Sequence, residues 1–218
     1  CADDGLTAHA ALGEVPHAPL ALDRGTGIGG VGLLVLWGLG EAAHLVAIEA
    51  QAVSHRLLLA NIAGNGLAAR VEPHLGDLRD FHDVRRFPLV TGSPPYFPLG
   101  TGIVPADSQK AHARFELRGD VRDYALAAAR HLTDDGVFVF CFPTPQKERA
   151  LAAVDAAGLV TTRIRDVIPR ATLRPLFTLF SARRAGTLVP EADPPLTVRE
   201  QTGELTAEMR EVRRRFGF

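Results

Sequence analysis

A glycine-rich loop between an apolar strand and an apolar helix constrains the fold of this chain most strongly. Ala18 to Asp23 is predicted to be a buried strand, and Asp23-Arg24-Gly25-Thr26-Gly27-Ile28-Gly29 follows it directly. The apolar residues from Ile28 to Leu39 then predict a helix. Glycines permit a tight turn and let a nucleotide approach the backbone closely. This order of strand, loop and helix predicts a nucleotide-binding α/β fold.

Acidic residues follow the next two predicted strands. His44 to Ile48 ends in Glu49, which lies about 20 residues past the glycine loop and is placed to bind ribose hydroxyls. Asp77 comes just after the strand from Ala69 to Pro73. It can accept the amino group of an adenine, or it can equally cap a following helix. The cofactor-binding residues we expect are Asp23, Gly25, Thr26, Gly27, Gly29, Glu49, Asp77 and Leu78.

A stiff loop with free acceptors follows the predicted strand from Phe87 to Val90. Its sequence is Ser93-Pro94-Pro95-Tyr96-Phe97. Two consecutive prolines fix the backbone and remove two donors, so carbonyl oxygens are left to accept from another group. These carbonyls and the Ser93 hydroxyl can bind an exocyclic amino group, and Tyr96 offers a flat face to a planar base. A proline-rich surface turn that closes on an aromatic residue is the alternative.

The rest of the chain alternates between helices and strands. Residues 99–118 have no clear periodicity and predict a long irregular loop beside the site. Strands over 159–168 and 176–182 predict an antiparallel hairpin, so the sheet is open and mostly parallel with one antiparallel strand. Near the start, Asp4-Gly5-Leu6 opens a short segment, and a helix is predicted to follow it through Leu12. The other predictions are helices over 51–63, 121–132, 145–157 and 206–216, a turn at Asp134-Asp135-Gly136, a strand over 137–142, and a linker over 187–196.

Composition restricts the class of protein without naming it. The chain has 218 residues, 46% of them hydrophobic, which suits one α/β domain. No apolar run is long enough to span a membrane, and Asp3 and Asp4 stand where a signal peptide needs positive charge. Cys1 and Cys141 do not suggest a disulfide framework, so we expect a cytoplasmic protein with Cys141 in its core. The eight histidines show no metal-ligand spacing, so we expect no metal.

Charge is distributed unevenly along the chain. The net charge is -1, yet residues 163–218 hold 11 arginines against 7 acidic residues. Arginine clustered at one end can contact phosphates, although solvated surface charge gives the same bias. Arg213-Arg214-Arg215 is the densest part of this cluster.

Several of these motifs together resemble a known family. The glycine spacing differs from the G-x-G-x-x-G of hydride-transferring Rossmann enzymes and is similar to that of class I S-adenosylmethionine (SAM) methyltransferases. Ser93-Pro94-Pro95-Tyr96 resembles the motif of members that methylate amino groups. Further motifs resemble the bacterial tRNA adenine-N6 methyltransferases that modify the adenine 3′ of the anticodon in a valine tRNA; they are Asp4-Gly5-Leu6, Ala113-Arg114-Phe115-Glu116, Val167-Ile168-Pro169-Arg170 and Gly203-Glu204-Leu205-Thr206-Ala207-Glu208.

The resemblance implies a fold and a set of roles. The expected fold is a Rossmann-like class I methyltransferase with a seven-stranded, mostly parallel sheet, an antiparallel terminal strand and helices on both faces. Residues 1–186 would form this domain, and residues 187–218 a C-terminal extension with a short basic helix. SAM is the implied cofactor and RNA, most specifically tRNA, the implied partner. Ser93, Pro94, Pro95 and Tyr96 would be catalytic, and Phe97, Arg114, Glu116 and Arg170 would bind the substrate.

Two departures from the family pattern keep alternatives open. The family usually has Asn where Ser93 stands, and Ser-Pro-Pro-Tyr also occurs in cytosine-N4 DNA methyltransferases. It also usually has an apolar residue where Arg24 stands. DNA adenine-N6 methylation, methylation of a protein glutamine, and a non-catalytic module that binds SAM or RNA remain the other interpretations.

Overall fold

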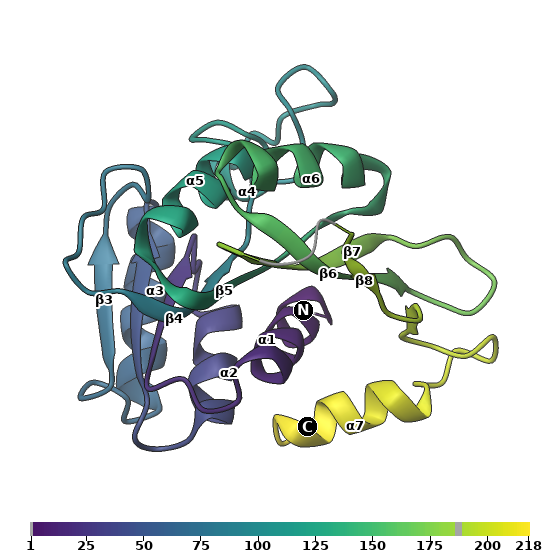
Figure 1. The fold of residues 1–218 in the computed structure, drawn as a ribbon, viewed down its shortest axis with the longest axis horizontal. Helices are drawn as coiled ribbons and strands as arrows, with labels where there is room; N and C mark the ends of the chain where they lie inside the picture. Colours follow the sequence, from purple (N-terminus) through teal and green to yellow (C-terminus); the bar gives the residue numbers. More distant parts are fainter. Residues whose placement is uncertain (1, 186–188) are drawn as a thin grey trace.

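One mixed β-sheet with helices on both faces forms the centre of the molecule (Figure 1). The computed structural model describes residues 2–185 and 189–218. The strand order is β3-β2-β1-β4-β5-β7-β6-β8, and β9 also pairs with β6. Only β7 is antiparallel to its neighbours among the described strands. The strands are β1 (Leu20–Arg24), β2 (His44–Glu49), β3 (Val71–Leu75), β4 (Phe87–Gly92), β5 (Leu132–Pro143), β6 (Val160–Ile168), β7 (Phe177–Arg183), β8 (Glu191–Ala192) and β9 (Leu196–Thr197).

Each face of the sheet buries its own apolar core. On one face α1 (Ala2–Glu14), α2 (Gly30–Leu39), α3 (Ala52–Gly64) and α7 (Ala207–Arg215) share a core. On the other face α5 (Val121–His131) and α6 (Lys147–Ala156) cover a core that contains a stack of Phe138, Phe140 and Phe180. The short α4 (Ser108–Arg114) lies in the connection from β4 to α5, and the 3-10 turn Thr144–Gln146 precedes α6. No helix in the described part of the chain is long and apolar enough to cross a membrane.

The predicted fold class is confirmed, with three differences in detail. The sheet has nine strands because the two-residue strands β8 and β9 join β6, so the expected seven are β1 to β7. The turn predicted at Asp134-Asp135-Gly136 lies within β5, where the register to β4 shifts between Phe87 and Leu89 and absorbs the extra residues. The irregular loop predicted over 99–118 contains α4, whose N-terminus is capped by Asp107.

The C-terminal segment packs onto the rest of the fold. The side chains of Met209 and Val212 on α7, and of Phe216 just after it, are buried in the same core as Leu6 and Leu12 of α1. The Thr206 hydroxyl accepts from the amide of Met209 at 3.2 Å and caps α7, where the basic helix was predicted. The expected boundary at residues 186 and 187, and the first two residues of the predicted linker, lie outside the described residues.

Parallel strands bring their carboxyl ends to one edge of the sheet. The loops that follow β1, β2, β3 and β4 therefore meet there, as in other open α/β sheets that bind ligands. Because β6 runs in the same direction as β5, the turn after Ile168 reaches this edge as well.

Candidate active site

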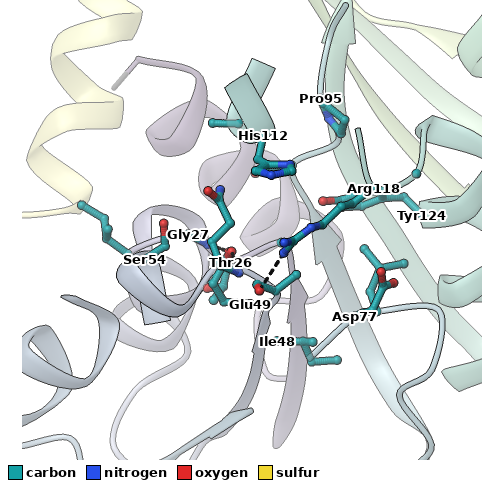
Figure 2. A pocket seen from close by; sticks show the side chains of 18 of the residues that line it. Thr26, Gly27, Ile48, Glu49, Ser54, Asp77, Pro95, His112, Arg118 and Tyr124 are labelled. Carbon is teal, nitrogen blue, oxygen red and sulfur yellow. Dashed lines mark hydrogen bonds between the residues drawn. The ribbon is translucent and has the colours of Figure 1, made fainter. Parts of the chain in front are cut away.

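A cavity of about 290 Å³ opens at the carboxyl ends of these strands (Figure 2). Its size is close to the lower end of the range for small-molecule sites. Most of the predicted cofactor residues contribute to its wall. They are Gly25, Thr26, Gly27, Glu49, Asp77 and Leu78, and they are joined there by Ser93 and Pro95.

Asp23 supports the glycine loop from below and does not line the cavity. Its carboxylate accepts from the hydroxyls of Thr26 at 2.6 Å and Thr91 at 2.7 Å, and from the amide of Gly32 at 3.0 Å. The pairing of Asp23 with Thr91 in adjacent strands explains the second contact. Burial raises the pKa of Asp23, and these three hydrogen bonds oppose the rise. Asp23 of β1 therefore holds the glycine loop, β4 and the start of α2 in fixed positions relative to one another.

The glycines are needed for their backbone conformation and for space. Gly25 and Gly27 both have φ near +60°, in the left-handed region that side chains disfavour. A Cβ at Gly25 would overlap the hydroxyl oxygen of Tyr124, whereas Gly27 faces open space. The open backbone at Gly27 lets a ligand lie directly on the loop. Gly29 turns the chain into α2 and does not line the cavity.

Glu49 is held in place at the end of β2. One carboxylate oxygen accepts from the Gly27 amide at 2.8 Å and the other from the Gln51 amide at 2.7 Å. Its side chain is buried and contributes to the cavity wall. Each carboxylate oxygen has two lone pairs, so Glu49 keeps acceptor capacity for the hydroxyls of a ribose.

Asp77 and Leu78, which follow β3, also line the cavity. The residues that follow form a turn rather than a helix, so the alternative prediction of a helix cap at Asp77 is wrong. The Arg79 side chain donates to both carboxylate oxygens at 2.9 and 2.7 Å, and these bonds are the main cause of a lowered pKa at Asp77. Asp77 is thus an ionised acceptor beside the apolar Leu78.

The Ser93-Pro94-Pro95 loop lies against the end of β1. The Ser93 amide donates to the Arg24 carbonyl at 3.3 Å, which fixes the loop beside the glycines. Ser93 and Pro95 line the cavity, and Pro94 does not. Acceptors of the loop and the cofactor residues thus share one cavity, although 44 residues separate Glu49 from Ser93 in the sequence.

Tyr96 points toward the sheet rather than into the cavity. Its hydroxyl lies 3.1 Å from the Cys141 sulfur, and its ring packs edge-on against Phe142. Burial raises the pKa of Tyr96, and it raises the pKa of Cys141 to about 11, so both groups are neutral. Cys141 is a core residue, as predicted. Phe97 is 43% exposed and packs on Phe115, with ring centroids 5.6 Å apart.

The predicted substrate residues are not gathered at one point. The Arg114 carbonyl accepts from the amides of Tyr96 and Phe97, so residue 114 supports the proline loop through its backbone while its side chain is exposed. Glu116 makes a bidentate ion pair with Arg149 of α6 at 2.5 and 2.8 Å. Arg170 is exposed in the turn after β6. Arg114 and Arg170 can meet a large substrate, whereas Glu116 holds its own loop against α6.

Arg24 is fully buried on the opposite side of β1 from Asp23. One of its nitrogens lies 2.6 Å from His131 Nδ1, and Nε and Nη1 have no partner among the described residues. Burial lowers the pKa of Arg24 to about 9, so it is still a cation at neutral pH. Arg24 lies in the core beneath α5 and does not line the cavity.

The cavity wall also contains residues that motif reasoning did not place there. Among them are Asp4, His112, Arg118 and Tyr124. His112 and Arg118 come from the region without periodicity, and Tyr124 occupies an apolar position of a regular helix, so the sequence offers no signal for these three. Asp4 belongs to the Asp4-Gly5-Leu6 motif, which pointed to a family but not to a position.

A second cavity of about 640 Å³ adjoins the first. The two share Asp4, Ile28 and Gly30. The second cavity lies between the first turns of α1 and α2 and the helix α7, with Arg199 and Arg213 in its wall. The described residues bring together no group of three His, Cys, Asp or Glu side chains that could hold a metal ion.

Comparisons with known proteins agree with this geometry. No family model matches the chain. A tRNA1(Val) (adenine(37)-N6)-methyltransferase from Actinobacillus pleuropneumoniae serotype 7 is 24% identical over 94% of this chain and 85% of its own. One of the same name from Phocaeicola vulgatus is 31% identical over 68% of this chain and 62% of its own.

Solved structures share the fold. A protein described as a predicted O-methyltransferase from Agrobacterium tumefaciens superposes with a TM-score of 0.74 at 16% identity, covering 98% of this chain and 96% of its own. A glycopeptide N-methyltransferase, MtfA, solved with SAM gives 0.58 at 14% identity over 84% and 94%. The chain thus has a Rossmann-like methyltransferase fold and is similar over most of its length to curated tRNA1(Val) (adenine(37)-N6)-methyltransferases, which confirms the resemblance predicted from its motifs.

Proposed function

We propose that this protein transfers a methyl group from SAM to N6 of an adenine in tRNA, most specifically the adenine 3′ of the anticodon in a valine tRNA. The observation that carries the proposal is that Ser93 and Pro95 line the same cavity as Gly27 and Glu49. The proline loop, which can accept hydrogen bonds from an amino group, therefore lies beside the glycine loop, which can bind a nucleotide. The names of the curated relatives support the substrate.

The cavity has the donors and acceptors that SAM requires. The acceptor oxygens of Glu49 suit the ribose, Asp77 and Leu78 suit the amino group and the apolar face of the adenine, and the open backbone at Gly27 suits the methionine portion. SAM, when bound, supplies a methyl group activated by a positively charged sulfur.

The chain's own residues then act on the amino group of the target base. This nitrogen conjugates with the ring and is a poor nucleophile until it becomes more tetrahedral. Hydrogen bonds donated by its N–H groups to the Ser93 hydroxyl oxygen and the Pro94 carbonyl oxygen stabilise that change and the positive charge that develops. The two prolines hold these acceptors rigidly, so little reorganisation is needed. The rest of the rate enhancement comes from alignment of the nitrogen with the methyl group.

Beyond the cofactor cavity, the substrate requires an aromatic side chain that stacks on the target base and a basic surface that binds the RNA backbone. Tyr96 does not line the cofactor cavity, but it is only half-buried, so its ring would stack against a base extruded beside the cavity, and the exposed Phe97 would close the other side. Two connections that reach the same edge of the sheet as the cavity carry exposed Arg114 and Arg170. Their charges suit phosphates and would position the RNA without reading its sequence. A tRNA substrate would be met in the cytoplasm.

Mass spectrometry of nucleosides tests the proposal. The protein and SAM are incubated separately with tRNA lacking the modification, with DNA and with a release-factor peptide that contains glutamine. We expect N6-methyladenosine in the tRNA sample only. N4-methylcytosine in DNA would assign the Ser93 loop to cytosine, methylglutamine would assign it to protein, and binding of SAM with no product in any sample would leave a non-catalytic module.

A further inference from the structure

The connection from β4 to α5, residues 98–120, crosses over the cofactor cavity, and Arg118 reaches from it into the cavity (Figure 2). We propose that Arg118 is a cofactor-binding residue that contacts the adenosine part of SAM from the side opposite the strands. This inference rests on the proposed function, since it takes SAM as the ligand of the cavity.

Arg118 lines the same cavity as the residues that suit the adenosine. Its Nη1 donates to the Ala50 carbonyl at 2.9 Å, and Ala50 directly follows Glu49. Its charge also contributes, after the hydrogen bonds and charge of Arg79, to the lowered pKa of Asp77. The guanidinium therefore lies beside the end of β2 that carries Glu49, and its charge acts on Asp77.

The chemistry of the guanidinium fits this position. It is planar, carries five donors, and stacks on aromatic faces. The bond to the Ala50 carbonyl occupies one of these donors. The remaining donors can reach the ring nitrogens or ribose oxygens of an adenosine, and the flat face can cover the adenine ring.

The surrounding segment holds Arg118 in place before any ligand arrives. On one side, Glu116 forms the bidentate pair with Arg149. On the other, Asp120 and Asp123 form a reciprocal cap at the start of α5. Farther back, the Gln109 side chain donates to the Ser54 hydroxyl at 3.1 Å and ties α4 to α3. These contacts position the backbone on either side of Arg118, and the bond to the Ala50 carbonyl orients its side chain, so less freedom is lost on binding.

Calorimetric titration with two ligands tests the assignment without measuring turnover. S-adenosylhomocysteine contains the whole cofactor skeleton, and 5′-methylthioadenosine lacks the amino-acid part. We expect Arg118→Ala to weaken both ligands by about tenfold or more, because hydrogen bonds to a charged group are lost. Arg118→Lys keeps the charge but not the planar fork, and we expect it to weaken both ligands at least severalfold.

Arg122→Ala is the matched control, because Arg122 is exposed on the next helix and does not line the cavity. Melting temperatures without ligand show whether the variants fold. Wild-type affinity for both ligands in either Arg118 variant would overturn the assignment. Weaker binding of S-adenosylhomocysteine with wild-type binding of 5′-methylthioadenosine would also overturn the assignment, because Arg118 would then contact the amino-acid part. If Arg118→Ala does not fold, Arg118→Lys decides. If the wild-type protein binds neither ligand, the proposed function fails instead.

Discussion

Tyr96 illustrates how a motif can name a residue without fixing its orientation. Its ring packs against Phe142 and its hydroxyl meets Cys141, yet the ring is also the stacking surface that the proposed reaction needs. Tyr96→Phe retains the ring and Tyr96→Ala removes it. We expect Tyr96→Ala to lower the turnover rate on RNA, because the free energy of one stacking contact, about 1–3 kcal/mol, is lost. SAM affinity should be unchanged.

Tyr96→Phe is the control for the lost hydroxyl and should keep turnover near the wild-type value. Single-turnover rates per folded molecule and melting temperatures separate the two roles. A strong fall in the melting temperature of Tyr96→Ala with the rate per folded molecule intact would show that the ring only packs the core.

The buried charge of Arg24 is expected to lower the stability of the folded protein. Two of its donors are buried without partners, and its neighbour His131 is not an acid. Replacement of buried ionic groups by apolar side chains is often neutral or stabilising by about 1–4 kcal/mol. We therefore expect Arg24→Met to raise the free energy of unfolding in urea at pH 7.5. A lower value would mean that Arg24 has a structural partner.

The same pair predicts a pH dependence. Burial lowers the pKa of His131, and the Arg24 charge lowers it further against the opposing bond to the Ala127 carbonyl. As the pH falls below the ordinary value of about 6.5, the unfolded chain takes up a proton that the folded chain resists, so stability is lost. The loss of unfolding free energy between pH 7.5 and pH 5.5 should be smaller in Arg24→Met. An equal loss would show that the two groups are not coupled.

How far the site could be predicted depends on how local each signal is. Glu49 and Ser93 were found because each ends a strand, and the sheet then brings strand ends together. Arg118 was not found because it acts from a segment without periodicity, whose path over the cavity depends on contacts such as Glu116 with Arg149. For Glu116 the motif pointed to substrate, whereas the structure shows an ion pair that only the folded chain can form.

At the scale of elements, α7 shows that a run of arginines is not one surface. Arg214 pairs with Glu211 at 2.5 Å, and Arg215 approaches His9 at 3.5 Å. Arg213 instead lines the second cavity, which adjoins the cofactor site. The position of each residue on the helix, rather than the sum of charges, therefore decides which one is placed to contact RNA.

This difference predicts unequal effects of the same substitution. We expect Arg213→Gln to weaken tRNA binding and to reduce the slope of log affinity against log salt by about one, because one phosphate contact releases fewer counterions. Arg214→Gln is the matched control and should change little. Filter binding at several salt concentrations measures both, and SAM affinity should be unchanged. Equal effects would favour a diffuse attraction over a defined contact.

At the scale of the whole molecule, the order of elements was predictable because each strand and helix has its own periodicity and turn signals. The attachment of the C-terminal segment was not, because β8 and β9 are only two residues long and gain their identity by pairing with β6. The apolar positions of α7 likewise indicate a buried face but not the helix that it packs against. We propose that residues 189–218 are an extension of the methyltransferase domain rather than a separately folding unit.

Cooperative unfolding tests that proposal. Met209 of α7 and Leu12 of α1 are buried in one core, so replacing either by alanine removes packing from the same cooperative unit. Each change should lower the free energy of unfolding by about 2–5 kcal/mol and shift a single transition. Fluorescence of Trp37 on α2, which lies outside the C-terminal extension, should follow the same transition as the far-ultraviolet circular dichroism. If Met209→Ala shifted only a separate early transition while the Trp37 signal kept its wild-type midpoint, α7 would be an independent unit docked on the domain.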